Sequence, residues 1–267
     1  MNGAILRGIL GAGHDPKNIT ATLRSDTRAA SLRELGINVL IGNEDPEANK
    51  KAAAAADIVF LGVKPVGITA LCDEISPALN ASTVVVSVAA AITLSTMQGH
   101  LPAGQPVVRS MPNTPLMVGA GVVGLSAGAA VSEQQIERVT ELFSGSGDVH
   151  VIDESQQNAL SAISGSGPAY VFYLAESMQS AAENLGLPKE AAAVLSKQTI
   201  LGSSKMMLGN VPTDELRRSV TSPGGTTEAA IRYMENKDWA QTFEHAIKKA
   251  KERSKELSSM TETCTTR

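Results

Sequence analysis

The sequence predicts a doubly wound α/β domain followed by an all-helical domain. The first half alternates short β-branched runs with helical segments. This alternation is typical of a parallel sheet with helices on both faces. Near Asp153 the β-branched runs stop, and alanine- and leucine-rich helical patterns take over. We therefore expect an α/β domain at residues 1–153 and a helical domain at residues 154–267.

The first segment departs from the usual order of such domains, because a helix is predicted at residues 1–10, before any strand. A Rossmann-like domain normally opens with a strand and a glycine-rich turn that leads into its first helix. Gly11 and Gly13 follow this helix, so we interpret them as its C-terminal turn and not as a phosphate-binding loop. The sequence thus predicts a Rossmann-like fold whose first strand and glycine-rich loop are missing.

The following segments alternate regularly as far as residue 112. Uninterrupted apolar runs predict strands, and apolar residues that recur every three or four positions predict helices. The expected strands are residues 18–23, 37–41, 57–63, 83–89 and 106–112. The expected helices between them are residues 27–35, 46–56, 67–79 and 93–101.

The second half is predicted to be helical throughout. The expected helices are residues 156–165, 168–186, 189–209, 213–220, 226–237 and 240–260. Helices 168–186 and 189–209 carry small and apolar residues around most of their circumference, which favours burial. A domain this small offers few places to bury them, so we expect dimerisation through it. A compact monomeric bundle is the alternative.

Composition excludes several classes of partner. The net charge of −4 leaves no basic surface for nucleic acid. No apolar run reaches the roughly 18 residues that a membrane-spanning helix needs. Two widely separated cysteines and the lack of a visible signal peptide are typical of a cytoplasmic protein. No Cys/His cluster has metal-ligand spacing, so no metal is expected.

Three stretches combine glycine or proline with hydroxyl or amide side chains where helices are expected to begin. They are MPNTP at 111–115, SGSGPAY at 164–170 and TSPGGTT at 221–227. Backbone N–H groups and hydroxyls at a helix start suit an anion such as a carboxylate or a phosphate. One such stretch alone is better explained as a helix cap, but three in one chain favour ligand binding.

Together with VKP at 63–65, these stretches resemble the pyrroline-5-carboxylate reductase family in order and spacing, over essentially the whole chain. The resemblance implies an enzyme that reduces the cyclic imine 1-pyrroline-5-carboxylate to L-proline with NAD(P)H, the last step of proline biosynthesis. It also implies a homodimer, or a decamer built from dimers.

The resemblance extends to the first helix. The family opens with a strand and Gly-x-Gly-Asn-Met, and Met1 matches that methionine, with Ala4, Ile5, Gly8 and Leu10 in register. The family's strand and phosphate loop would precede it. A truncated, cofactor-deficient homologue without catalytic activity is therefore the alternative function.

The end of the strand 18–23 bears on the choice of cofactor. NAD-specific folds place an acidic residue there to bind the ribose hydroxyls. Arg24 and Ser25 offer a guanidinium and a hydroxyl, which suit a 2′-phosphate, so NADPH is favoured, with NADH as the alternative. Asp26 weakens this inference, and a surface role for Arg24 stays open.

The remaining cofactor residues are those that the resemblance implies. Asn49 would lie near the adenosine phosphate, Lys64 at the nicotinamide ribose, and Asn113 near the nicotinamide. Ala91 stands where the family has a glycine. The full expected cofactor-binding set is Met1, Arg24, Ser25, Asn49, Val63, Lys64, Pro65, Ala89, Ala90, Asn113 and Thr114.

The resemblance places the substrate site in the second half. Thr227 would be the catalytic residue, close to the ring nitrogen, and Glu154 would lie near the substrate. For Glu154, a helix N-terminal charge is an equally good explanation. The residues expected to bind substrate are Glu154, Ser222, Gly224, Gly225, Thr226 and Thr227. A related hydroxy-acid dehydrogenase would need a lysine in a G-x-x-x-N-x-x-K pattern, and none follows SGSGPAY.

Overall fold

The computed structural model describes the backbone of residues 1–265 and the side chains of residues 1–260. Two compact units make up the chain. The α/β unit comprises Met1–Gly165 together with the segment from Lys251, and the helical unit comprises Ser166–Ala250. This division differs from the predicted boundary at residue 153. The reason is that the buried Gln157 side chain donates to Gly124 O and Ser126 Oγ, which ties the following residues to the sheet.

The α/β unit alternates strands and helices, as the sequence predicts. Its strands are β1 (Thr20–Leu23), β2 (Asn38–Ile41), β3 (Ile58–Leu61), β4 (Val84–Ser87), β5 (Val107–Pro112), β6 (Gly121–Ala127) and β7 (Gly147–Val151). Its helices are α1 (Asn2–Gly11), α2 (Ala29–Arg33), α3 (Ala48–Ala54), α4 (Ile68–Ile75), α5 (Leu94–Gln98), α6 (Glu133–Ser144) and α7 (Gln157–Leu160). The turn at Gly13 has φ 91° and follows α1, which confirms its interpretation as a helix end.

The larger sheet has the order β3-β4-β5-β6-β7. Its first three strands are parallel, as expected, and β6, for which the sequence predicts no strand, pairs with β5 in the antiparallel sense. The segment from β6 to β7 was also not assigned from sequence. Gly121 and Gly124 interrupt the apolar run of β6, and a Cβ on Gly147 at the start of β7 would overlap the carbonyl oxygen of Gly121. Glycine allows the two backbones to approach closely here, and its lack of a side chain removes the apolar alternation from which a strand is predicted.

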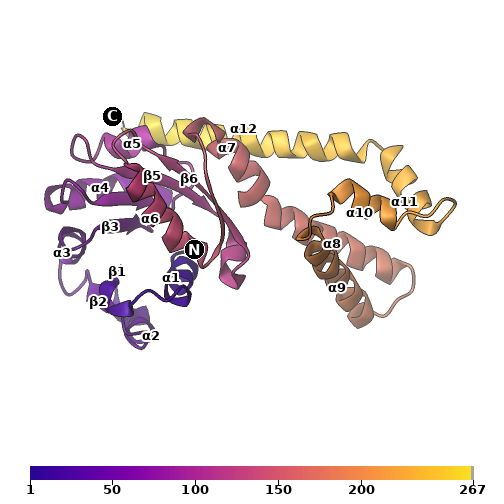
Figure 1. Ribbon diagram of the computed structural model, residues 1–267, viewed down its shortest axis with the longest axis horizontal. Helices are drawn as coiled ribbons and strands as arrows, with labels where there is room; N and C mark the ends of the chain where they lie inside the picture. The colour runs from indigo at the N-terminus through magenta and orange to yellow at the C-terminus, as the bar shows by residue number, and fades with distance from the viewer. Residues whose placement is uncertain (266–267) are drawn as a thin grey trace. The chain divides into compact units, whose positions relative to one another are not determined.

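The strands β1 and β2 form a separate parallel pair (Figure 1). Within the described residues no strand pairs with the second edge of β1 or of β3. Asn2 donates its Nδ2 to Gly62 O at 2.6 Å, which places the start of α1 at the carboxyl end of β3. In a doubly wound sheet the first strand lies between these two edges and leads into the first helix. The described residues place no strand between the β1–β2 pair and β3.

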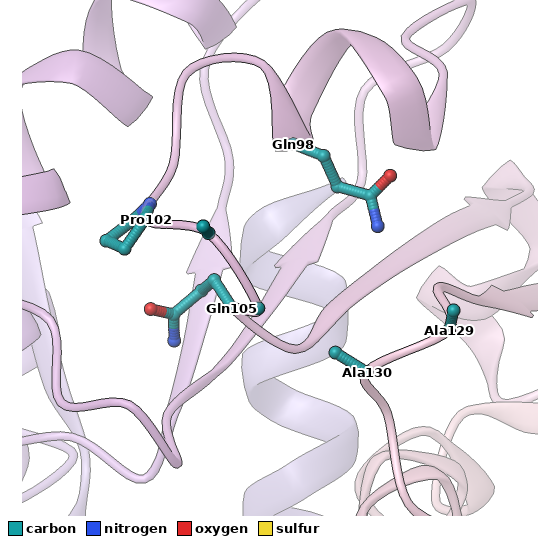
Figure 2. A pocket seen from close by; sticks show the side chains of 7 residues that line it. Gln98, Pro102, Gln105, Ala129 and Ala130 are labelled. Atoms are coloured by element: carbon teal, nitrogen blue, oxygen red, sulfur yellow. The ribbon is translucent and has the colours of Figure 1, made fainter.

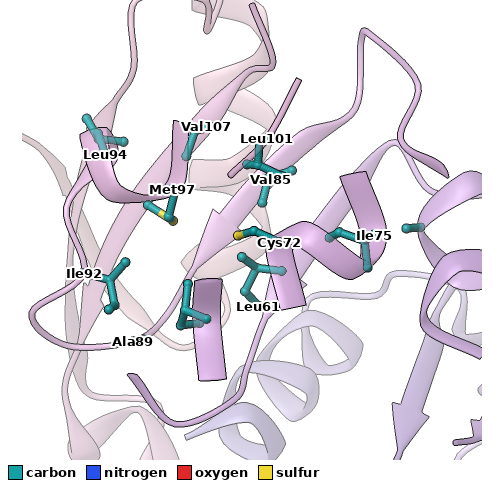
Figure 3. Packing of buried hydrophobic residues seen from close by; sticks show 12 residues of the cluster. Leu61, Cys72, Ile75, Val85, Ala89, Ile92, Leu94, Met97, Leu101 and Val107 are labelled. Carbon is teal, nitrogen blue, oxygen red and sulfur yellow. The ribbon is translucent and has the colours of Figure 1, made fainter. Parts of the chain in front are cut away.

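Helices cover both faces of the larger sheet, as predicted. On one face α4 and α5 pack against Leu61, Val85 and Val107 (Figure 3). On the other face, α1 and α6 pack against the alternate residues of the same strands, such as Val84 and Val86. Every residue of β4 is buried, which explains its unbroken VVVS sequence.

Cys72 lies in the core on the α4 side, among Leu61, Val85 and Met97 (Figure 3). Burial raises the pKa of its thiol from 9.0 to about 12. The second cysteine, Cys264, lies outside the residues whose side chains the structure describes.

The buried thiol predicts a loss of stability at alkaline pH. The pKa of Cys72 is higher in the folded chain than in the unfolded chain. The contribution of the protonated thiol to the free energy of unfolding is therefore intact below pH 9.0, and it is lost as the pH rises towards about 12. We expect the free energy of unfolding of the unmodified chain to fall more steeply over this range than that of Cys72→Ala. Urea unfolding at several pH values measures this difference, and parallel curves would contradict it.

The helical unit contains α8 (Gly167–Asn184), α9 (Lys189–Met207), α10 (Thr213–Ser219), α11 (Thr226–Glu235) and the first part of α12 (Trp239–Thr265). No residue of α8 is buried in the single chain, and α9 buries only Ala192 and Ser196. Large apolar side chains such as Phe172 and Leu195 stay exposed. A compact monomeric bundle with its own core is therefore not what the single chain forms. Among the described helices, none has the length and apolar character needed to span a membrane.

Candidate functional site

The predicted cofactor residues collect where parallel strands end. Arg24 follows β1, Val63 follows β3, Ala89 follows β4 and Asn113 follows β5. The ends of β3, β4 and β5 adjoin, since Leu61 pairs with Ser87 and Ser87 pairs with Arg109. Ligands of open α/β sheets bind at the carboxyl ends of the strands. The structure thus brings together three of the four predicted segments on one sheet and places the fourth on the β1–β2 pair.

The segment after β1 presents hydroxyl and cationic groups to solvent. Arg24 is exposed, and Ser25 Oγ lies 3.1 Å from Thr27 Oγ1. Ser25 also precedes a short 3₁₀ turn, Asp26–Arg28, that adds a second exposed arginine. Sequence reasoning missed Thr27 and Arg28. The close spacing of arginine and hydroxyl residues in RSDTR is the signal that would have found them.

The residues after β3 are open to solvent. Val63, Lys64 and Pro65 are all exposed, as is Met1 at the start of α1. Asn49 differs, because its Nδ2 donates to Glu74 Oε1 at 3.0 Å and so links α3 to α4. Its donor group is thus engaged within the fold.

The loop after β4 carries backbone strain. Ala91 has φ 65°, a left-handed conformation that L-residues adopt at a cost. Ala89 is buried in the core, whereas Ala90 is exposed. Strain of this kind is often found at ligand-binding loops.

Replacing Ala91 by glycine tests this strain. We expect Ala91→Gly to raise the free energy of unfolding by about 1 kcal/mol, because glycine adopts positive φ without steric cost. Ala90→Gly is the matched control and should lower stability, since Ala90 has no positive φ. Chemical denaturation of the three chains gives the comparison, and equal destabilisation by both changes would contradict it.

Asn113 is buried and uses both ends of its amide. Its Nδ2 donates to Ser164 O at 3.0 Å, and its Oδ1 accepts from the Val122 N–H at 2.9 Å. Ser164 belongs to a π-helical turn, Ser161–Gly165, at the end of the α/β unit. The side chain therefore joins β5, β6 and this turn, while its neighbour Thr114 stays exposed.

Glu154 makes two contacts within the α/β unit. Its Oε1 accepts from Arg109 Nη1 at 3.0 Å and from the Leu94 N–H at 2.7 Å. Sequence reasoning missed Arg109, although an arginine inside the apolar run VVRSM signals a buried ion pair. The predicted contact between Glu154 and substrate stays a prediction.

The predicted substrate segment lies in the helical unit at the start of α11. Gly225 is the N-terminal cap of this helix, and Gly224 has φ 73°. Thr226 and Thr227 occupy the first turn, whose N–H groups have no acceptor within the helix. The segment thus directs N–H groups and hydroxyls towards the same helix end, which suits a carboxylate.

Glu228 is a neighbour that sequence reasoning missed. It accepts from the Gly224 N–H at 2.6 Å and pairs with Arg232 at 2.9 Å. The carboxylate therefore fixes the loop before α11 and already takes one of its N–H groups. Its position three residues into the helix, after the glycine pair, is the sequence signal for this role.

Pockets in the α/β unit include the following two. One, of about 320 Å³, is lined by Gln98, the 102–105 loop and the 129–130 turn (Figure 2). It lies before β5 begins, at the opposite end from the predicted cofactor residues. The other, of about 390 Å³, includes Glu154 and Val151. Among the described residues, no group of three or more His, Cys, Asp or Glu side chains is placed to hold a metal.

The Rossmann-like unit and the ligand-binding residue types at its strand ends define an NAD(P)-dependent oxidoreductase with a helical second domain. Residues 154–257 match the profile of pyrroline-5-carboxylate reductase dimerisation domains. Residues 1–91 match that of coenzyme F420-dependent NADP oxidoreductases. Both profiles support the fold class predicted from sequence.

Comparison with individual proteins identifies the family. The pyrroline-5-carboxylate reductase of Corynebacterium melassecola is 41% identical, over 95% of this chain and 94% of that protein. The solved structure of the Coxiella burnetii enzyme matches with a TM-score of 0.90 and 37% identity, over 96% of this chain and 94% of that one. That of Plasmodium falciparum, with NADP bound, has a TM-score of 0.82 and 28% identity, over 96% and 94% of the two chains. The chain belongs to the pyrroline-5-carboxylate reductase family, which confirms the resemblance.

Proposed function

We propose that the chain reduces 1-pyrroline-5-carboxylate to L-proline, with NADPH as the preferred hydride donor. The observation that carries the proposal is the 222–227 segment. There the glycine pair, Ser222 and two threonines meet at the N-terminus of α11, in a family whose named members are pyrroline-5-carboxylate reductases. We also propose a cytoplasmic location, since the free, buried Cys72 is typical of a reducing compartment.

The residues after β1 fit the 2′-phosphate that distinguishes NADPH from NADH. Arg24 and Arg28 are exposed cations beside the hydroxyls of Ser25 and Thr27. Guanidinium groups bind phosphate through paired, charge-assisted hydrogen bonds. The NADP-bound Plasmodium falciparum relative agrees with this choice. NADH, whose ribose lacks that phosphate, should bind more weakly.

The other proposed cofactor residues would line the cofactor or shape the loops around it. Lys64 and its neighbours Val63 and Pro65 would line the nicotinamide ribose, and Thr114 would face the nicotinamide. For Asn49, Ala89 and Asn113, the observed contacts or burial favour shaping the loops around the cofactor, whereas Met1 is exposed at the start of α1. When bound, the reduced nicotinamide supplies the hydride for the reaction.

The proposed chemistry requires few protein groups. The substrate carboxylate would bind the Ser222 hydroxyl and the N–H group and hydroxyl of Thr226. It would reach the N–H groups of Gly224 and Gly225 by displacing the Glu228 carboxylate and the Ser222 carbonyl oxygen that now accept from them. The Thr227 hydroxyl would hydrogen-bond the ring nitrogen. Because the protonated imine is the better electrophile, its carbon accepts the hydride and the nitrogen becomes an amine. The protein contributes alignment and exclusion of water.

We propose that the chain assembles as a homodimer through the helical unit, with a decamer as a higher state. Its apolar side chains stay exposed in the single chain, including Phe172, Tyr173 and Leu195. Exposed apolar patches of this kind mark interfaces. The match of residues 154–257 to a dimerisation profile supports the same conclusion. Sedimentation of the purified chain measures the assembly.

The experiment that tests the function follows the absorbance of NADPH with 1-pyrroline-5-carboxylate as substrate. We expect NADPH oxidation and formation of L-proline in equal amounts. A parallel assay with a 2-hydroxy acid and NADP should show no turnover. Turnover of the hydroxy acid without imine reduction would overturn the proposal.

A further inference from the structure

Arg109 is a cation buried in the middle of the sheet. It lies on β5 opposite Ser87, and its side chain is only 6% exposed. A buried guanidinium without a counter-charge is strongly unfavourable. Glu154 supplies that counter-charge at 3.0 Å, although it lies 45 residues later in the chain.

The same carboxylate oxygen also holds the start of α5. Glu154 Oε1 accepts from the N–H of Leu94, the first residue of this helix, at 2.7 Å. Helices leave their first N–H groups without internal partners, and an anion there is stabilising. One oxygen therefore connects three segments, namely β5, α5 and the 3₁₀ turn Glu154–Gln156.

The segments that this oxygen connects carry candidate cofactor residues. The 88–93 loop, with Ala90 and the strained Ala91, ends at Leu94. Strand β5 continues from Arg109 to Pro112, and Asn113 follows it directly. A loop held in a strained conformation needs fixed ends, and the Glu154 contact fixes one of them.

We propose that Glu154 is a positioning residue. Through Arg109 and the Leu94 N–H it holds the 88–93 loop in the conformation that receives the cofactor. It does not contact the substrate. This inference rests on the proposed function, and it replaces the expected substrate contact of Glu154 with a role towards the cofactor loop.

The test compares Glu154→Gln with Glu133→Gln in the full chain. Glu133 is the matched control, because it is an exposed glutamate in the first turn of α6. For Glu154→Gln we expect the Kd of NADPH, measured without substrate, to rise about tenfold, because the 88–93 loop loses the contact that fixes one of its ends. Backbone hydrogen exchange over residues 88–97 should become faster. The KM for the imine should not change, and Glu133→Gln should match the unmodified chain.

A second variant separates positioning from stability. Arg109→Met combined with Glu154→Gln removes the buried charge together with its partner, so it should be more stable than Glu154→Gln alone. Its Kd for NADPH should nevertheless stay raised. A raised KM for the imine with unchanged NADPH binding and unchanged exchange would overturn the inference in favour of direct substrate contact. If the unmodified chain binds no NADPH, the proposed function fails, and the exchange over residues 88–97 still decides whether Glu154 fixes the loop.

Discussion

A chain in which an apolar strand and a Gly-x-Gly-Asn turn are joined to Met1 will bind NADPH about a hundredfold more tightly than the 267-residue chain. The reason is the interruption between β1 and β3, where each strand has an edge without a pairing strand in the described residues. The Asn2–Gly62 contact places the start of α1 at the carboxyl end of β3. A parallel strand between the two edges would therefore end where α1 begins.

The size of this effect follows from the phosphate contacts. A glycine-rich turn before a helix directs backbone N–H groups at a pyrophosphate. Hydrogen bonds to charged groups contribute about 1.5–3 kcal/mol each, so two of them give a factor of about a hundred or more. The added strand would also satisfy the open edges of β1 and β3, which should raise the unfolding temperature.

The control is an extension of equal length made of glycine and serine, which should change neither NADPH binding nor stability. Titration of NADPH fluorescence measures the affinities. Equal binding by the 267-residue chain and the strand-extended chain would show that the interruption is unimportant for the cofactor. Failure of both to bind would instead favour a non-catalytic homologue.

Thr227→Val will lower kcat/KM for imine reduction about a hundredfold, because removal of one transition-state hydrogen-bond donor typically costs that much. Valine keeps the branched shape of threonine and removes only the hydroxyl. Thr227 lies in the first turn of α11 and is partly buried, so the change should leave the fold intact. The loss should appear in kcat, since the nitrogen becomes a better acceptor as the imine is reduced.

Two further variants make this result specific. Thr227→Ser restores the hydroxyl and should recover most of the activity. Ser222→Ala removes a proposed carboxylate contact and should raise KM with little change in kcat. Steady-state kinetics in the strand-extended chain gives the larger signal. An active Thr227→Val variant would remove Thr227 from the proposed chemistry.

The order of elements up to β5 could be predicted because its signals are local. Val84, Val85 and Val86 are buried on both faces of a parallel strand, and that burial leaves an unbroken apolar run in the sequence. The helices of the second half are predicted from equally local signals, namely their apolar periodicity and the glycine and proline residues between them. Strands β6 and β7 are not evident in the sequence because glycines replace apolar residues in them. Gly121 and Gly147 allow close backbone approach, and Gly124 makes room for the Leu160 side chain.

The sequence by itself determined the α/β-then-helical order, the family, and the strand ends and helix starts at which ligand residues lie. These depend on side-chain period and on short motifs, which involve neighbours in the chain. The tertiary structure alone decided how Glu154 and Asn113 are used. Glu154 meets Arg109 and Leu94, and Asn113 meets Ser164, across 45 to 60 residues of chain. Burial makes such partners obligatory, but only the folded chain determines which partner each polar group finds.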